Sequence, residues 1–249
     1  MYTVDVFKWG GMSPMRKNYF LKLAFRCFAL VFSAVLCGVK PETFDVMEGM
    51  NFFKKFSILH VLWGLWFFDM ILQLVPVEKV VPLGSHKLFE KRYIENKKGY
   101  DETGLKKYSS KEHKSALAIF IVWTVLTLTI GYLKMKDIID YGIMFVITTF
   151  FYVSDLICVL IWCPFRVFMN NRCCTTCRIF NWDHMMMFSP FFFSKGFYGI
   201  SLAVMAAIIM IIWECKVWKH PERFWTGSND ALKCKNCTDK LCSQYCPKK

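Results

Sequence analysis

The chain has 249 residues, of which 55% are hydrophobic and 18% aromatic, and a formal net charge of +13. A soluble domain of this length is less apolar and does not gather its apolar residues in blocks of about 20. The composition therefore excludes an ordinary soluble protein and predicts an all-α, polytopic transmembrane helical bundle. The basic residues stand mostly between the apolar blocks, which favours contact with a lipid bilayer and its anionic head groups rather than with nucleic acid.

Five apolar blocks predict about five membrane spans, in chain order at residues 19–39, 56–77, 115–133, 141–162 and 185–213. The first block carries Lys22 and Arg26, so it spans the membrane only if both basic side chains reach the head groups. The last block is longer than the roughly 20 residues that one span needs. We therefore expect its first part, up to Phe193, to lie in the interface and the rest to cross once.

These blocks divide the chain into an N-terminal tail, a bundle and a small cysteine-rich C-terminal tail, at residues 1–18, 19–213 and 214–249. The bundle contains a basic loop at 78–114 and a cysteine loop at 163–184. A single last crossing places the cysteine loop and the C-terminal tail on opposite faces. We call the face with the N-terminus and both loops side A, and the other face side B. Basic residues near the spans are slightly more frequent on side A, which predicts that the cysteine loop is cytoplasmic.

The cysteine loop contains three cysteines within five positions: Cys173, Cys174 and Cys177. Two cysteines three positions apart can ligate one metal ion or form a redox-active pair. The flanking Arg172 and Arg178 are expected to lower the thiol pKa, and His184 is a candidate fourth metal ligand. The alternative is that these are unpaired thiols in a reducing compartment, because C-x-x-C alone is a weak signal.

The C-terminal tail contains four cysteines in the order C-x2-C-x4-C-x3-C-P: Cys234, Cys237, Cys242 and Cys246. The spacing is compatible with a zinc site, which ranks first among the three interpretations. Two disulfides rank second and apply if side B faces an oxidising compartment. An iron–sulfur cluster ranks third, because four residues stand where the bacterial ferredoxin run has two.

Charged residues within the apolar blocks form a third candidate site, made of Arg26, Asp69, Asp155 and Lys195. Counting from the predicted span ends places all four roughly 10 Å below the side A surface. Two carboxylates and two cations at one depth can pair, and ionisable residues inside a membrane usually mark a functional site. The alternative is that the basic side chains reach the head groups and the aspartates are structural.

The run R-C-C-T-T-C-R-I-F-N-W-D-H-M-M-M-F-S-P precedes an apolar block, which H-P-E-R-F and C-K-N-C-T-D-K-L-C follow. This arrangement, over roughly residues 160–245, resembles a group of uncharacterised bacterial multi-pass membrane proteins. The resemblance implies a common membrane family located in a bacterial plasma membrane, and it transfers no activity to this chain.

Three classes of function remain open. The cysteine clusters favour a metal-binding or redox protein that transfers electrons at the membrane surface. The charged residues favour a transporter or channel for a small solute or ion, and both sets are also compatible with an accessory subunit that binds a protein partner or a second copy. The sequence contains no H-E-x-x-H, Walker, G-x-S-x-G or dinucleotide-binding motif, so it does not indicate a familiar enzyme.

Overall fold

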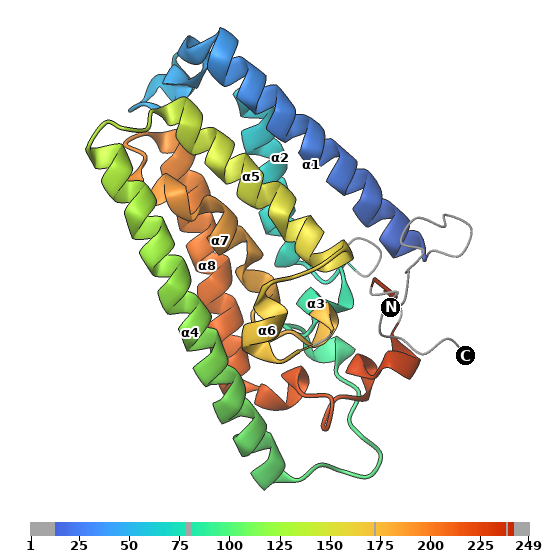
Figure 1. Cartoon of the computed structure of the whole chain (residues 1–249). Coiled ribbons are helices and arrows are strands. Elements are labelled where there is room, and N and C mark those ends of the chain that lie inside the picture. Colours follow the sequence, from blue (N-terminus) through green and yellow to red (C-terminus); the bar gives the residue numbers. More distant parts are fainter. Residues whose placement is uncertain (1–12, 78–80, 172, 238, 242–249) are drawn as a thin grey trace, which may run out of the picture.

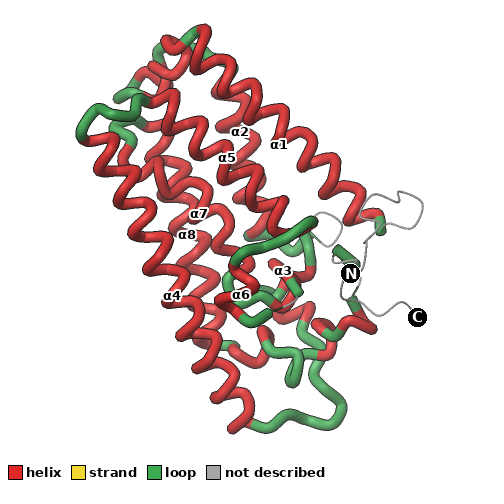
Figure 2. The backbone as a smooth tube through the Cα atoms, in the orientation of Figure 1, coloured by secondary structure: helices red, strands yellow, loops and turns green. Residues whose placement is uncertain are grey.

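The computed structural model describes residues 13–77, 81–171, 173–237 and 239–241, and these residues form an all-α bundle of transmembrane type, as predicted. Four helices are long and apolar enough to cross a membrane: α1 (Pro14–Val39), α4 (Glu102–Met135), α5 (Tyr141–Leu160) and α8 (Phe197–Lys219). Helix α2 (Leu59–Gln73) is apolar but shorter. Figure 2 shows helices throughout the bundle, with loops gathered at its two ends.

Polar caps define where the long helices begin. Ser13 accepts a hydrogen bond from the Arg16 amide at the start of α1. Asp101 caps α4 and Asp140 caps α5 in the same manner, each accepting from backbone N–H groups of the first turn. Such a cap satisfies donors that have no partner within the helix. Between α4 and α5 the chain turns through Asp137, whose φ of 54° is a left-handed conformation that Asp tolerates.

The remaining helical segments are short. They are η2 (Pro41–Met47), η3 (Asn51–Phe53), α3 (Leu83–His86), η4 (Glu90–Arg92), α6 (Phe165–Met169), η5 (Cys174–Thr176), η6 (Phe180–Trp182), α7 (Asp183–Phe188), η7 (Ser189–Phe193), η8 (Pro221–Phe224), η9 (Asp230–Leu232) and η10 (Cys234–Asn236). In Figure 1, side A is the lower end of the bundle, where α3, α6 and the C-terminal segment lie. The turns joining α1 to α2 and α4 to α5 lie at the opposite end, side B.

The basic loop is shorter than predicted, because α4 already begins at Glu102 and extends the third span toward side A. The outward surfaces of the long helices carry large apolar side chains, including the exposed Phe28 and Val31 of α1 and Val125 of α4. Such a surface suits a lipid bilayer, which is therefore the environment of the bundle.

The last apolar block does not form the single span that we predicted. Helix α7 and the 3₁₀ segment η7 run from side A toward side B over roughly 20 Å. The extended residues Ser194 to Gly196 complete this crossing: the Ser194 hydroxyl lies 3.4 Å from the Met47 carbonyl, and the Phe197 amide donates to Gly49 at 3.0 Å. Helix α8 then returns the chain to side A.

Gly196 makes this break in the helix possible. A Cβ atom built at Gly196 would lie 2.1 Å from the carbonyl oxygen of Met47, a distance that no real side chain adopts. The backbone of the crossing segment therefore approaches the η2 backbone closely, and Ser194 and Gly196 are buried. Irregular backbone at membrane depth is tolerated where it is enclosed by protein in this way.

The return of α8 overturns the predicted position of the C-terminal tail. The described part of the tail, which ends at Leu241, lies on side A, the same face as the cysteine loop, because two crossings rather than one separate them. Asp239 illustrates this arrangement: its carboxylate accepts from the Leu83 amide at 2.7 Å, and its carbonyl accepts from the Ser13 hydroxyl at 2.6 Å. The backbone of Glu95 also forms an isolated antiparallel bridge with Asn229.

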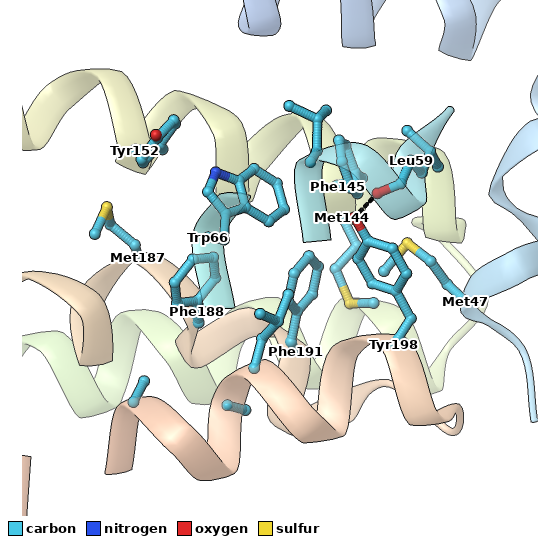
Figure 3. Packing of buried hydrophobic residues seen from close by; sticks show 14 of the residues in the cluster. Met47, Leu59, Trp66, Met144, Phe145, Tyr152, Met187, Phe188, Phe191 and Tyr198 are labelled. Carbon is cyan, nitrogen blue, oxygen red and sulfur yellow. Dashed lines mark hydrogen bonds between the residues drawn. The ribbon is translucent and has the colours of Figure 1, made fainter. Parts of the chain in front are cut away.

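Aromatic rings fill the centre and the side B half of the bundle (Figure 3). Trp66 of α2, Phe145 of α5, Phe188 of α7 and Tyr198 of α8 are fully buried against one another. The Tyr198 hydroxyl donates to the Leu59 carbonyl at 2.8 Å, the dashed line in Figure 3, so this polar atom is satisfied inside the core. The side A half contains ionic side chains and a cavity instead.

Candidate functional site

Arg26 of α1 and Asp155 of α5 form a buried ion pair in the side A half of the bundle. Arg26 Nη1 lies 2.7 Å from Asp155 Oδ2 and also donates to the Tyr152 carbonyl at 2.7 Å. The guanidinium stacks over the Tyr152 ring, 3.8 Å from its centroid. The same residues thus hold α1 against α5 and shield the charges from lipid.

Asp69 of α2 joins this pair and brings in residues outside the predicted set. Its carboxylate lies 4.0 Å from Arg26 Nη2, 3.6 Å from Lys22 Nζ and 3.5 Å from His184 Nε2. These separations exceed ordinary hydrogen-bond distances, so Asp69 is surrounded by cations without being tightly held by any one of them.

His184 connects Asp69 to a third carboxylate. Its Nδ1 lies 3.3 Å from Asp183 Oδ1, while Asp183 Oδ2 accepts from the Gln73 amide at 3.0 Å. The imidazole is buried, so it is part of the bundle interior and not a ligand in the cysteine loop. We call the connected residues the ionic network: Lys22, Arg26, Asp69, Asp155, Asp183 and His184.

Lys195 does not belong to the network, contrary to the prediction. It is exposed in the segment that joins η7 to α8, next to Tyr141 at the side B end of α5. The predicted depth assumed that the last apolar block was one continuous span. Because α7 and η7 already cross the membrane, Lys195 lies at the opposite end of the bundle from Asp155.

The network lines a cavity of about 290 Å³. Lys22, Arg26, Asp69, Asp155 and Asp183 supply its charged wall. The opposite wall is apolar and consists mainly of rings and thioethers from α4 to α7: Trp123, Phe150, Phe151, Phe165, Met186 and Met187. A mostly apolar pocket with a few converging polar groups is the usual form of a small-molecule site.

Four thiols also line the cavity: Cys158, Cys163, Cys174 and Cys177. Cys158 lies near the end of α5, one turn beyond Asp155, and Cys163 follows in the connection to α6. The Cys174 thiol is 3.8 Å from the Cys158 carbonyl. Two cysteines of the predicted loop site thus reach the same cavity as the ionic network, whereas Cys173 is not part of its lining.

The predicted effect of the arginines on the loop thiols is wrong for Cys174 and Cys177. Burial raises the pKa of Cys174 to about 11 and that of Cys177 to about 12. Arg178 does not offset this, because its guanidinium faces Glu214. These two thiols therefore stay protonated at neutral pH, and Arg172 lies outside the described residues.

The pKa of Cys163 shifts in the opposite direction, downward. A hydrogen bond from the Cys158 thiol, aided by the backbone N–H groups of Phe165 and Arg166, lowers the pKa of Cys163 to about 7. Cys163 is thus the cavity thiol that is most readily ionised near neutral pH, and thiolate is the reactive form.

A second ionic cluster joins the cysteine loop to α8. Arg178 makes two hydrogen bonds to Glu214, at 2.7 and 2.5 Å, and the Trp182 indole donates to the same carboxylate at 2.7 Å. The Arg178 carbonyl accepts from the Trp213 indole at 2.9 Å. We call Arg178, Trp182 and Glu214 the Arg178 clamp.

Lys87 lies beside the clamp and donates to the Cys177 carbonyl at 2.8 Å. Burial among the rings of Trp213 and Phe224 lowers the pKa of Lys87 to about 8. The side A end of the molecule is therefore held together by ordered polar contacts as well as by apolar packing.

The described residues contain no group of three or more His, Cys, Asp or Glu side chains arranged to hold a metal ion. In the tail, Cys234 begins η10 and Cys237 directly follows it, whereas Cys242 and Cys246 lie outside the described residues. The predicted zinc, disulfide and iron–sulfur interpretations of the tail therefore remain predictions.

The sequence predicts that Lys22 reaches the lipid head groups and that His184 is a metal ligand beside the cysteines. The spacing of both residues nevertheless contains a signal for their place in the ionic network. Lys22 stands four residues before Arg26 and therefore on the same helix face. His184 adjoins Asp183 at the start of an apolar block, where a membrane-inserted helix can begin.

No family model, no curated protein and no solved structure matches this chain.

Proposed function

We propose that the protein is a membrane transporter that binds a small molecule carrying both positive and negative charge in the cavity beside the ionic network. One observation carries the proposal: cations and carboxylates from α1, α2, α5 and α7 converge on a cavity in the side A half of a membrane-spanning bundle. Burying such charges is costly, and in membrane proteins they usually lie on the path of a substrate or ion.

The charge balance of the network supports a zwitterionic ligand. Lys22 and Arg26 oppose the carboxylates of Asp69, Asp155 and Asp183, and His184 lies between two of them. A ligand anion is attracted by the two basic side chains, while a ligand ammonium group is attracted by the carboxylates. A ligand with a charge of a single sign would use only one of these two sets of side chains.

The broken crossing formed by α7, η7 and the extended segment supports transport. Transporters commonly bind substrate where a discontinuous helix meets its neighbours, and movement of that element exposes the site to either side. Here α7 carries Asp183 and His184 at the cavity, and extended residues separate its continuation η7 from α8.

Uptake into phosphatidylcholine proteoliposomes tests the proposal, using radiolabelled phosphoethanolamine and a mixture of labelled amino acids as probes. Lys22→Met removes one cation but leaves the Arg26–Asp155 pair in place, and should lower uptake about tenfold, equivalent to roughly 1.4 kcal/mol. The matched control is Asp45→Asn, which removes an exposed ion pair with Lys55 far from the cavity. Wild-type uptake of both probes no faster than that of empty vesicles would contradict the proposal.

The ionisable Cys163 favours thiol redox chemistry as a second candidate function. The electron-accepting reagent diamide should take two electrons and two protons from Cys158 and Cys163 and leave a disulfide between them. Peptide mapping by mass spectrometry identifies the bond, with Cys163→Ser as the matched variant. Absence of a Cys158–Cys163 disulfide after treatment that oxidises other thiols in the protein would eliminate this candidate.

Orientation and metal content belong to the same proposal. With the tail on side A, Lys216 and Lys219 add to the basic residues of that face, which strengthens the prediction that side A is cytoplasmic in a bacterial plasma membrane.

A zinc ion bound by the tail cysteines would stabilise this end as an accessory module. Metal analysis of the purified protein, compared with Cys237→Ser, tests this point.

A further inference from the structure

The cavity reaches the outer surface of the bundle at Phe150. This residue lines the cavity, yet 55% of its surface is exposed on the spanning part of α5. Ser154, one turn further toward side A, also lines the cavity, and its hydroxyl donates to the Phe150 carbonyl at 2.8 Å. The position of Phe150, ten residues before the end of α5, places this opening within the hydrocarbon layer.

The charged wall of the cavity has a donor that the protein does not satisfy. Arg26 uses its two terminal nitrogens on Asp155, Tyr152 and Asp69, whereas its buried Nε–H has no hydrogen-bond partner among the residues that the structure describes. An unpaired buried donor is costly, so the protein does not fully satisfy this guanidinium. Phosphate, like carboxylate, offers oxygen acceptors that suit the two-pronged geometry of a guanidinium.

From the side opening and the charged wall together, we infer that the ligand is a zwitterionic phospholipid whose head group enters the cavity from the bilayer between α5 and its neighbours. The inference rests on the proposed function of the cavity and specifies the class of its ligand. The phosphate is bound by Arg26 and Lys22, and the ammonium group by the carboxylates of Asp69 and Asp183. A volume of about 290 Å³ accommodates a head group but not two acyl chains, which stay in the membrane beside Phe150.

Photocrosslinking tests the inference. The wild-type protein is reconstituted into phosphatidylcholine vesicles that contain phosphatidylethanolamine with a diazirine in its acyl chain, and crosslinked peptides are mapped. The expected result is saturable labelling of the α5 peptide around Phe150, which lysophosphatidylethanolamine suppresses and diacylglycerol does not.

Two variants on α5 make the test specific. Ser154→Trp fills the opening without changing a charge and should reduce labelling at least about tenfold. Ile143→Trp places the same ring on the exposed surface of α5 near side B, away from the cavity, and should leave labelling unchanged. Equal labelling of the two variants, or equal competition by diacylglycerol, would mean that the probe reports only the surrounding lipid and would overturn the inference.

The uptake experiment separates this inference from the proposed function. If soluble phosphoethanolamine is taken up but the crosslinking is unspecific, the lipid ligand is refuted and the proposed transport function is not. Absence of both uptake and specific crosslinking refutes both. Specific crosslinking without uptake supports the lipid ligand and removes the water-soluble solute.

Discussion

The two ionic clusters of side A differ in how closely their charges are held. In the Arg178 clamp, the guanidinium, the carboxylate and an indole meet at 2.5 to 2.7 Å. In the ionic network, only the Arg26–Asp155 pair is this short, and the contacts of Asp69 lie between 3.5 and 4.0 Å. The clamp satisfies its own charges, whereas the network leaves a cavity beside them. The difference separates a structural contact from a binding site.

The clamp also requires that the cysteine loop and the C-terminal end of α8 share one face of the membrane, which gives an all-or-none prediction. Cysteines introduced at Lys97 and Lys235, which are exposed on side A, should react from the same side with a membrane-impermeant maleimide. A cysteine at Lys136, exposed near the turn between α4 and α5, should react only from the other side. Labelling of the Lys97 and Lys235 positions from opposite sides would instead support the topology predicted from the sequence, in which the last apolar block crosses the membrane once.

Breaking the clamp should destabilise the protein more than any other single ionic change. Glu214→Gln leaves the Arg178 side chain, which is 3% exposed, without its counter-charge. Removal of one partner from a buried pair costs about 3–5 kcal/mol. Thermal unfolding in detergent, followed by tryptophan fluorescence, should show a clear loss of stability relative to Asp45→Asn. A midpoint equal to that of the control would show that the clamp is not structural.

Breaking the network at Asp155 should cost less than breaking the clamp, because Asp69 remains near Arg26 and the cavity admits water. The partner of Asp155 is Arg26 and not Lys195, so the informative double variant is Arg26→Met with Asp155→Leu. We expect a coupling free energy of about 1–3 kcal/mol between these positions. Arg26→Met combined with Lys195→Met should be additive. If the changes in the free energy of unfolding caused by Arg26→Met and Asp155→Leu simply add, the ion pair contributes nothing to stability.

The cavity thiols should differ in their dependence on pH. Alkylation of Cys163 by iodoacetamide should rise through a midpoint near pH 7, whereas Cys177 should stay unreactive until the pH is several units higher. The native pKa of Cys163 lies below the ordinary value of a thiol, so the unfolded chain binds more protons between about pH 7 and 9. Cys163 therefore adds a contribution to the free energy of unfolding that rises with pH across this window, and Cys163→Ser should remove that contribution. A Cys163 midpoint near 9 would contradict the hydrogen bond from Cys158.

The sequence predicts the positions of most spans and part of the ionic network. Four of the five predicted spans appear as apolar helices close to the expected positions, namely α1, α2, α4 and α5, although α2 is shorter than the others. Arg26 contacts both Asp69 and Asp155, and the sequence predicts this proximity because a rise of about 1.5 Å per residue fixes relative height within a continuous helix.

The errors in topology share one cause, the break in the last apolar block. Its residues are apolar throughout the crossing, so hydropathy does not reveal where the helix ends. The break depends on Gly196 lying against the η2 backbone, a contact between segments far apart in the sequence. The same contact reverses the side of the tail and moves Lys195 away from Asp155. The raised pKa of Cys177 was likewise hidden, because burial depends on the packing of Lys87 and the tail.

Protection of Cys163 by a ligand tests the central claim, that the ionic network lines a binding site, most directly. Cys163 lines the same cavity as Arg26 and Asp155, whereas Cys215 is exposed on α8 outside it. In wild-type protein, lysophosphatidylethanolamine or phosphoethanolamine should slow alkylation of Cys163 several-fold and leave the rate at Cys215 unchanged. Equal rates at Cys163 with and without both compounds would contradict the claim that this cavity binds a zwitterion.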